Sequence, residues 1–154
     1  MLKIRVLAVG RLREPYIAAA VADFRKRLRP YRAVEQVEVA SARGASPERA
    51  TEEEGERLLR ALQRGEPLWL LERSGVAFSS EALAERLRAL ERDGTPLLAI
   101  AIAGTYGASA ALQARADLRW SLSPLTFLHE WARALVYEQL YRAAKISRGE
   151  AYHH

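Results

Sequence analysis

The sequence predicts an α/β fold built on a mostly parallel sheet, and three observations lead there. Short runs of branched apolar residues alternate with amphipathic helical segments, the order expected when crossover helices join parallel strands. Some of these runs are apolar throughout, as in strands that are covered on both faces. The chain of 154 residues is about half hydrophobic, which suits one globular domain with its own core. We therefore expect residues 1–154 to form a single domain of five strands and five helices.

The first elements follow from the spacing of apolar residues. A branched run over residues 3–10 ends in glycine, which indicates a strand. Pro15 suits a first helical turn, and apolar side chains then recur at helical spacing until Pro30 stops the pattern. Valine and glutamate are interleaved over residues 34–39, so we expect a second, partly exposed strand at an edge of the sheet.

The second helix has a clear start. Ser46 predicts its N-cap and Pro47 its first residue, and the helix is expected to run to about Gln63. Its acidic residues 52–56 are expected on a solvated face. Gly65 is expected in the C′ position, where glycine accepts a left-handed conformation.

Two buried strands are expected on either side of the third helix. Residues 67–71 form a continuous apolar run, and residues 73–75 predict a turn after it. Ser79 predicts the N-cap of a helix that ends at Gly94. Residues 97–103 then predict a fourth, fully apolar strand.

The C-terminal third begins with a glycine-bearing loop over residues 104–107, followed by a short helix over 109–116 and a strand over 118–122. After a loop to about His129, a last helix is expected to reach Arg148. Apolar residues cover far more of this helix than the usual third of its circumference. We therefore expect it to be packed on two sides, with a second copy of the chain on one of them.

The polar strip of the last helix carries Glu138, Arg142 and Lys145 at positions i, i+4 and i+7. Glu138 can pair with Arg142 one turn further on. The residues leave two interpretations open. The pair is a surface ion pair, or the strip lines a cleft between two subunits and Arg142 binds phosphate or a base.

Composition excludes several kinds of chemistry. The chain has no cysteine and only three histidines, which excludes thiol nucleophiles and makes a metal site unexpected. It contains no GxGxxG after the first strand, no P-loop and no GxSxG motif. Residues 94–114 are uncharged but interrupted by proline and glycine, so we expect no membrane span there. Lys3 and Arg5 lie inside the first apolar run, so we expect no secretory signal, and the absence of cysteine favours a cytoplasmic location.

The remaining chemistry is a reaction that depends on positioning. Ligands of parallel sheets bind beyond the carboxyl ends of the strands, here near the loops after Leu71, Ala103 and Leu122. These loops are kinked or rich in small residues, so their backbone can approach a ligand closely. In-line transfer of a group already activated on a cofactor suits them better than covalent catalysis.

Positive charge is concentrated near the N-terminus of this chain, whose formal net charge is +5. In this region only Glu14 and Asp23 oppose a group of seven basic residues: Arg11, Arg13, Arg25, Lys26, Arg27, Arg29 and Arg32. Guanidinium groups suit phosphate oxygens. One interpretation is therefore a polyanionic partner such as RNA, and the other is a solvated helix face.

Three separated motifs carry a resemblance to a known family. They are WSLSPLTF at residues 120–127, EQLYRA at 138–143 and the terminal pair Tyr152 and His153, and the opening run 4–10 and the total length agree. Over essentially its whole length the sequence resembles the ribosomal RNA large subunit methyltransferase H family. The resemblance implies a SPOUT-class fold with a C-terminal trefoil knot, a rare exception to the rule that protein chains are unknotted.

The resemblance also implies an enzyme that uses S-adenosyl-L-methionine to methylate N3 of a pseudouridine in 23S ribosomal RNA, on assembled ribosomes and as a homodimer. Arg142 would meet the RNA, and the tail with Tyr152 and His153 would reach the neighbouring active site, which makes these three the catalytic candidates. The cofactor would lie in the knot, held by Leu71, Gly104, Ser123, Pro124, Leu125, Thr126, Phe127 and Leu128.

The N3 proton of a pseudouridine must be lost, so a nearby base or a cation should help. The sequence does not choose among four candidates: His129, Glu138, Tyr152 and His153.

The sequence departs from the family pattern in three places. Residues 103–107 read AGTYG where members usually have two glycines followed by Pro-Glu-Gly, Leu128 replaces a proline, and His154 replaces a final basic residue. Two rival interpretations follow from the residues. One is a noncatalytic RNA-binding dimer whose altered glycine loop no longer binds the cofactor, and the other is an unrelated α/β enzyme acting on a small anionic metabolite.

Overall fold

The protein is described by a computed structural model over residues 1–152, in which five parallel strands form one sheet in the order β2-β1-β4-β3-β5. This confirms the α/β prediction. In chain order the elements are β1 (Lys3–Val9), α1 (Pro15–Leu28), β2 (Val34–Val39), α2 (Pro47–Ala61), β3 (Leu68–Ala77), α3 (Ser80–Arg92), β4 (Leu97–Ile102), α4 (Ala110–Arg115), β5 (Leu118–Ser121) and α5 (His129–Ser147).

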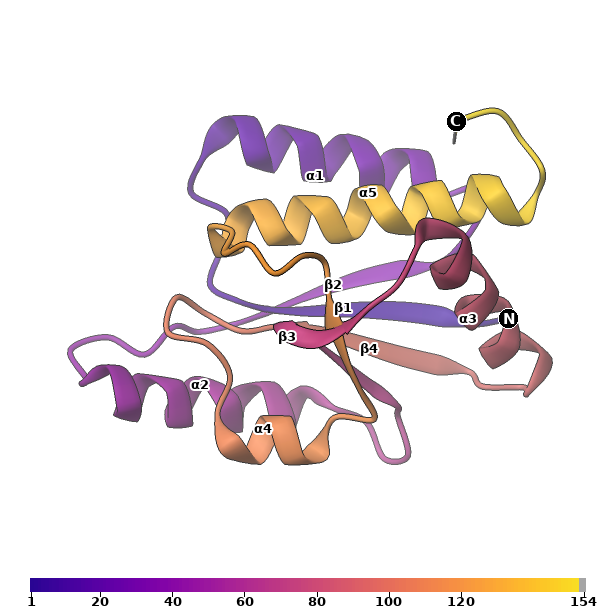
Figure 1. Ribbon diagram of the computed structural model, residues 1–154. Helices are drawn as coiled ribbons and strands as arrows, with labels where there is room; N and C mark the ends of the chain where they lie inside the picture. The colour runs from indigo at the N-terminus through magenta and orange to yellow at the C-terminus, as the bar shows by residue number, and fades with distance from the viewer. Residues whose placement is uncertain (153–154) are drawn as a thin grey trace.

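The sheet is the middle of three layers. Helices α1, α3 and α5 cover one face, and α2 with α4 cover the other (Figure 1). Alternation along β1 explains the two cores, because Ile4 and Val6 pack under the first group of helices while Leu7 and Val9 pack under the second. Since all strands run the same way, the loops that follow them gather at one edge of the sheet.

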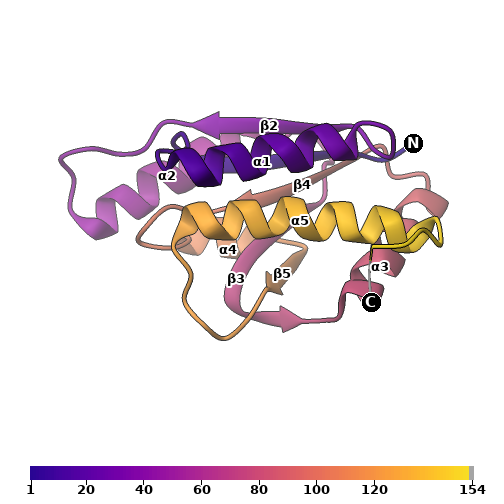
Figure 2. The same cartoon turned by 90° about the horizontal axis from the view of Figure 1, so that it is seen from above.

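The strand environments match their sequence patterns. The mixed strand β2 is an edge strand, as predicted, and lies at the border of the sheet in Figure 2. The apolar strand β4 lies between β1 and β3, and its residues 98–102 are buried. The two predicted N-caps are confirmed, since Ser46 Oγ accepts a hydrogen bond from the Arg49 N–H and Ser79 Oγ from the Ala82 N–H.

The end of α2 differs from the prediction. The helix stops at Ala61, and Leu62 is its C-cap in an extended conformation. Gly65 has the expected positive φ of 75°, but it lies in the turn that leads to β3 and not at the C′ position of the helix. Gly94 does occupy the C′ position of α3 with a φ of 74°, as predicted.

The turn predicted at residues 73–75 is wrong, because these residues belong to β3. The strand continues to Ala77 and pairs with β5 in two stretches, with a register shift between Leu71 and Val76. Gly75 explains the shift, since a Cβ there would overlap the carbonyl group of Arg119 on β5. Glycine inside a strand often marks such an irregularity and a close approach of two backbones.

Helix α5 is packed on two sides, but within one chain. It lies beside α1 (Figure 2), contacts α3 as well, and faces the sheet. Val136, Tyr137 and Leu140 are almost fully buried in this way. The apolar circumference therefore does not require a second subunit, contrary to our inference from the pattern, and Trp131 is the large apolar side chain of α5 that remains exposed among residues 129–147.

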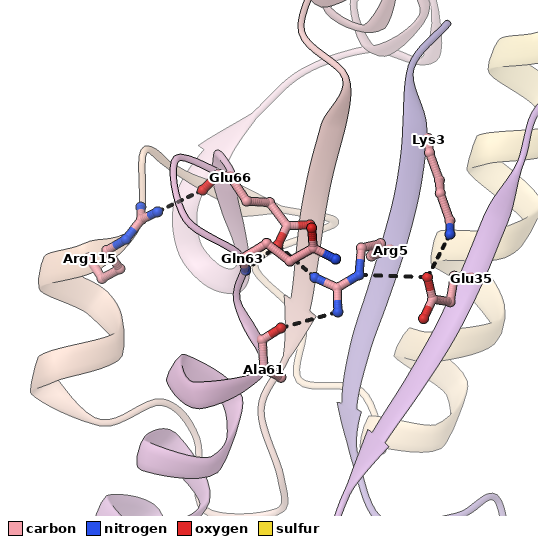
Figure 3. Close-up of polar contacts among 7 residues, drawn as sticks. All are labelled: Lys3, Arg5, Glu35, Ala61, Gln63, Glu66 and Arg115. Atoms are coloured by element: carbon pink, nitrogen blue, oxygen red, sulfur yellow. Dashed lines mark hydrogen bonds and ion pairs between the residues drawn. The ribbon is translucent and has the colours of Figure 1, made fainter.

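A buried ion pair joins the elements at the opposite edge of the sheet (Figure 3). Arg5 on β1 contacts Glu66 with 2.6 Å between Nη1 and Oε2, and its Nη2 donates to the Ala61 carbonyl at the end of α2. The Gln63 N–H donates to the same carboxylate, and Arg115 donates to the Glu66 carbonyl. The network fixes the start of β3 against β1.

No helix within residues 1–152 is long and apolar enough to cross a membrane.

Candidate active site

A cleft of about 570 Å³ lies at the carboxyl edge of the sheet, and we call it the main cleft. Residues 71–74 in the middle of β3 line it, together with residues 102–108 at and after the end of β4 and most of residues 122–127 after β5. The start of α5 closes it with His129. The sequence predicts ligand positions in loops after Leu71, Ala103 and Leu122. The last two are loops that line the cleft, whereas the residues after Leu71 line it as a continuation of β3.

The main cleft gathers most of the residues named by the resemblance. Two of them, Pro124 and Leu128, lie in the same segment without lining the cleft, and Leu128 is the N-cap residue of α5. The residues that do line it are Leu71, Gly104, Ser123, Leu125, Thr126 and Phe127. Their apolar and hydroxyl-bearing side chains leave backbone groups accessible.

Side-chain hydrogen bonds hold two walls of the main cleft together. Arg73 Nη1 donates to Thr126 Oγ1 at 3.2 Å, and Ser121 Oγ donates to the Arg73 carbonyl at 2.8 Å. Within the wall after β5, the Leu125 N–H donates to Ser123 Oγ at 3.1 Å. The extension of β3, which the sequence did not predict, is therefore what brings residue 73 to this loop.

The wall formed by Gly104 rests on a buried carboxylate. A Cβ at Gly104 would lie 2.6 Å from Glu54 Oε1, and Glu54 Oε2 accepts a hydrogen bond from the Ala42 N–H at 3.0 Å. Our prediction of a solvated face is wrong for Glu54, which is only 7% exposed. Gly55 could have indicated that this face of α2 is buried. A glycine in the middle of a helix permits close packing, and here it lets α2 pack closely against Ser109.

Two charged residues near the start of α5 anchor the helix to neighbouring loops, a role that the sequence pattern did not predict. Glu130 Oε1 accepts hydrogen bonds from the N–H groups of Arg13 and Glu14, at 2.6 and 3.2 Å. Arg133 is 1% exposed, pairs with Glu38 at 2.6 Å and donates to two carbonyl groups at the end of β1. Both side chains tie the last helix to the loops after β1 and β2.

A family model described as "Predicted SPOUT methyltransferase" matches residues 2–153. The chain belongs to the SPOUT methyltransferase family. It is 43% identical to "Ribosomal RNA large subunit methyltransferase H" of Symbiobacterium thermophilum, and 42% and 38% identical to proteins of the same name from Pelotomaculum thermopropionicum and Desulfitobacterium hafniense. Each similarity covers at least 99% of both chains. This SPOUT protein is therefore a methyltransferase, and S-adenosyl-L-methionine is the methyl donor of such enzymes.

The main cleft of this SPOUT methyltransferase fits a ligand of that kind. Its volume of about 570 Å³ falls in the range of small-molecule sites, roughly 300–1,000 Å³. Gly104 lines the cleft, and a Cβ there would displace Glu54 behind this wall. Within residues 1–152 no group of three or more His, Cys, Asp or Glu could hold a metal ion.

His129 is one of the titratable residues that line this cleft. Burial lowers its pKa below the ordinary value, and the neighbouring charge of Glu130 opposes part of the shift. The imidazole is therefore neutral at pH 7 and able to accept a proton. Glu72 also lines the cleft, with a partly buried side chain that lies 3.6 Å from Arg119.

The other catalytic candidates of the SPOUT methyltransferase lie at the far end of α5. Arg142 lies thirteen positions after His129 on this helix, a rise of about 20 Å. Arg142 forms the predicted i,i+4 ion pair with Glu138 at 2.6 Å, and its guanidinium lies 4.8 Å from the ring centre of Tyr152. The Tyr152 hydroxyl donates to the same Glu138 carboxylate at 3.2 Å.

Contacts within this distal cluster and its burial shift the pKa values of its members. The hydrogen bond that Arg142 donates to Glu138 raises the pKa of Arg142, and burial raises that of Tyr152. Lys145, predicted on the same strip, instead contacts Glu150 and Tyr31. His153 lies outside the described residues.

Proposed function

We propose that this SPOUT methyltransferase methylates ribosomal RNA, at N3 of a pseudouridine in the 23S RNA of assembled ribosomes. We further propose that residues 1–154 form a single cytoplasmic domain that works as a homodimer. The observation that carries the proposal is that the middle of β3 and the loops after β4 and β5 meet around one cleft. The relatives named as large-subunit ribosomal RNA methyltransferases support the choice of substrate.

In this proposal the main cleft holds S-adenosyl-L-methionine, which supplies an activated methyl group when bound. Leu71 and Gly104 form two walls, and residues 123–128 form the third. The contact between Arg73 and Thr126 keeps two of these walls at a fixed separation. Preformed walls favour an in-line arrangement of donor and acceptor, because less motion has to be frozen when they bind.

The acceptor nitrogen must lose a proton, and His129 is the best placed described residue to take it. Of the described base candidates, His129 lines the main cleft, whereas Glu138 and Tyr152 lie at the far end of the helix. Its lowered pKa keeps the imidazole in the form that accepts a proton at neutral pH. The hydrogen bonds of Glu130 to the loop after β1 fix the helix end that carries His129.

A homodimer would bring Arg142 and Tyr152 to a main cleft, because within one chain they lie about 20 Å too far along α5. An isologous contact with two antiparallel α5 helices places the C-terminal end of one helix at the N-terminal end of the other. An exposed apolar group of Tyr16, Leu128 and Trp131 lies at that N-terminal end, with the rings of Tyr16 and Trp131 5.7 Å apart. The trefoil knot remains a prediction.

The deciding experiment for the reaction uses ribosomes that lack the modification and a cofactor with a labelled methyl group. We expect label in 23S RNA at the N3 position of a pseudouridine. Label in no RNA would contradict the proposal. Calorimetry with the cofactor or its demethylated product distinguishes the enzyme from the rival RNA-binding dimer. For the enzyme we expect a dissociation constant in the micromolar range, equivalent to a binding free energy of about 8 kcal/mol, whereas the rival predicts no heat of binding.

Subunit complementation tests the shared site. Gly104→Val displaces Glu54 behind a wall of the main cleft, and Arg142→Ala removes the distal group, so each homodimer should be inactive. In the mixed dimer one of the two sites has both native residues, and activity should return. Failure to regain activity in a purified mixed dimer would contradict a site built from two chains. A charge at Leu140 would not test the interface, because this side chain is buried inside one chain, whereas Trp131→Glu does test it.

A further inference from the structure

A second cleft of about 810 Å³ lies beside the main cleft, and we call it the arginine cleft. Its basic residues come from the loops after β1 and β2, with Arg11 and Arg13 on the first loop and Arg43 on the second. The same three arginines also line a third cleft, of about 880 Å³. The main cleft and the arginine cleft share Gly104 and His129, so the arginines border the place where the acceptor nucleotide would sit.

These three arginines are exposed, and within residues 1–152 none of their side chains forms an ion pair or a hydrogen bond. They differ in this from most arginines of the sheet and helices, for example Arg133 and Arg142. Unneutralised guanidinium groups on a surface are free to bind phosphate oxygens as a planar fork.

Acidic residues also line the arginine cleft, but their carboxylates are already engaged. Glu130 accepts two backbone N–H groups of the Arg13 loop, and Glu54 accepts the Ala42 N–H next to Arg43. Glu38 pairs with the buried Arg133. The carboxylates therefore shape the two arginine-bearing loops, and the loops present their positive charge outward.

We propose that Arg11, Arg13 and Arg43 bind backbone phosphates of the RNA strand next to the target nucleotide, an assignment that rests on the proposed function. Phosphate contacts fix the register and orientation of a nucleic acid without reading its sequence. A strand held over the arginine cleft has its target base beside the main cleft. Glu130 is a positioning residue in this arrangement. It lies on the helix that carries His129, and its carboxylate binds the loop that carries Arg11 and Arg13.

The test compares binding of unmodified ribosomes, without cofactor, by the native protein and by the triple variant Arg11→Gln, Arg13→Gln and Arg43→Gln. We expect the dissociation constant to rise about tenfold or more at low salt. The slope of log K against log salt should fall by about 2, because each phosphate contact on a single strand contributes about 0.7. Arg64→Gln is the matched control, an exposed arginine at the opposite edge with no ion pair within the described residues.

Three outcomes would overturn the assignment. They are unchanged ribosome affinity with an unchanged salt slope, an equal loss in the Arg64→Gln control, and an equal loss of cofactor affinity, which would mean damage to the main cleft. Glu130→Ala should raise KM for ribosomes with little change in cofactor affinity. Because the binding assay needs no methyl transfer, it tests the arginine surface even if the protein fails to methylate ribosomal RNA, which would refute the proposed function separately.

Discussion

Replacement of Gly104 by alanine is the sharpest test of how the main cleft is built. The added Cβ would lie 2.6 Å from Glu54 Oε1 and 3.3 Å from Glu54 Cδ. Both distances are shorter than the optimal separation of nonbonded heavy atoms, roughly 3.5–4.0 Å. The carboxylate must therefore move, and its hydrogen bond from the Ala42 N–H must lengthen or break.

The expected cost is about 2 kcal/mol in the free energy of unfolding. Overpacking a close-fitted interior costs roughly 1–3 kcal/mol, and a hydrogen bond to a charged group contributes about 1.5–3 kcal/mol. A single displacement of Glu54 causes both losses, so they are not summed. The cofactor dissociation constant should rise as well, because the Gly104 backbone is a wall of the cleft.

A double-mutant cycle with Glu54→Ala separates this clash from other effects. Removing the carboxylate makes room for the methyl group, so Gly104→Ala should cost little in the Glu54→Ala background. The coupling energy from urea unfolding should be about 2 kcal/mol. Gly107→Ala is the control partner, since a Cβ there meets nothing within 4 Å and should not couple to Glu54. Additive effects of Gly104→Ala and Glu54→Ala, within about 0.5 kcal/mol, would refute this account of the glycine.

Three further predictions concern stability. Glu66→Gln should lower the free energy of unfolding by about 3 kcal/mol because it removes the closer counter-charge of the buried Arg5 and leaves only Glu35, at 3.7 Å. A loss no larger than that of the exposed Glu56→Gln would contradict this. Gly107 has a φ of 91°, a conformation that asparagine tolerates better than alanine. Gly107→Ala should therefore lower the free energy of unfolding by about 1 kcal/mol and Gly107→Asn by less. Equal losses in urea unfolding would count against a conformational cause. Burial lowers the pKa of His129 in the folded protein. The contribution of His129 to the free energy of unfolding is therefore fully present above the pKa of the unfolded state, about 6.5, and is lost as pH falls through the pKa of the folded state. Denaturation midpoints at pH 7.5 and 5 should therefore differ less in His129→Gln, and parallel profiles would exclude this origin.

Local signals in the sequence were enough for most of the fold. The caps at Ser46 and Ser79 were predicted because a serine side chain and its own helix form a short-range unit. The edge position of β2 followed from its mixed composition, since a strand with one neighbour keeps a polar face. Each of these features depends on residues close together in the chain.

The errors involve contacts between distant segments. Residues 73–75 look like a turn by composition, yet pairing with β5 extends the strand through them. Glu54 looks solvated within an acidic run, yet it is buried against a loop fifty residues later. Glu130 and Arg133 gave no signal as loop anchors, because their partners lie more than ninety residues away. Such partners are set by the topology and not by the local pattern.

The distal cluster lies too far along α5 to reach the main cleft of its own chain. Gly149 has a φ of 65° and turns the tail back, so that the Tyr152 ring packs on Tyr141 with 4.8 Å between ring centres. Even if the tail were released from this contact, the four residues after Arg148 would span at most about 14 Å. The start of α5 at His129 lies about 28 Å from Arg148 along the helix axis. If Tyr152 acts at a main cleft, that cleft must therefore belong to another chain, and a monomeric variant with full activity would exclude the tail from the reaction.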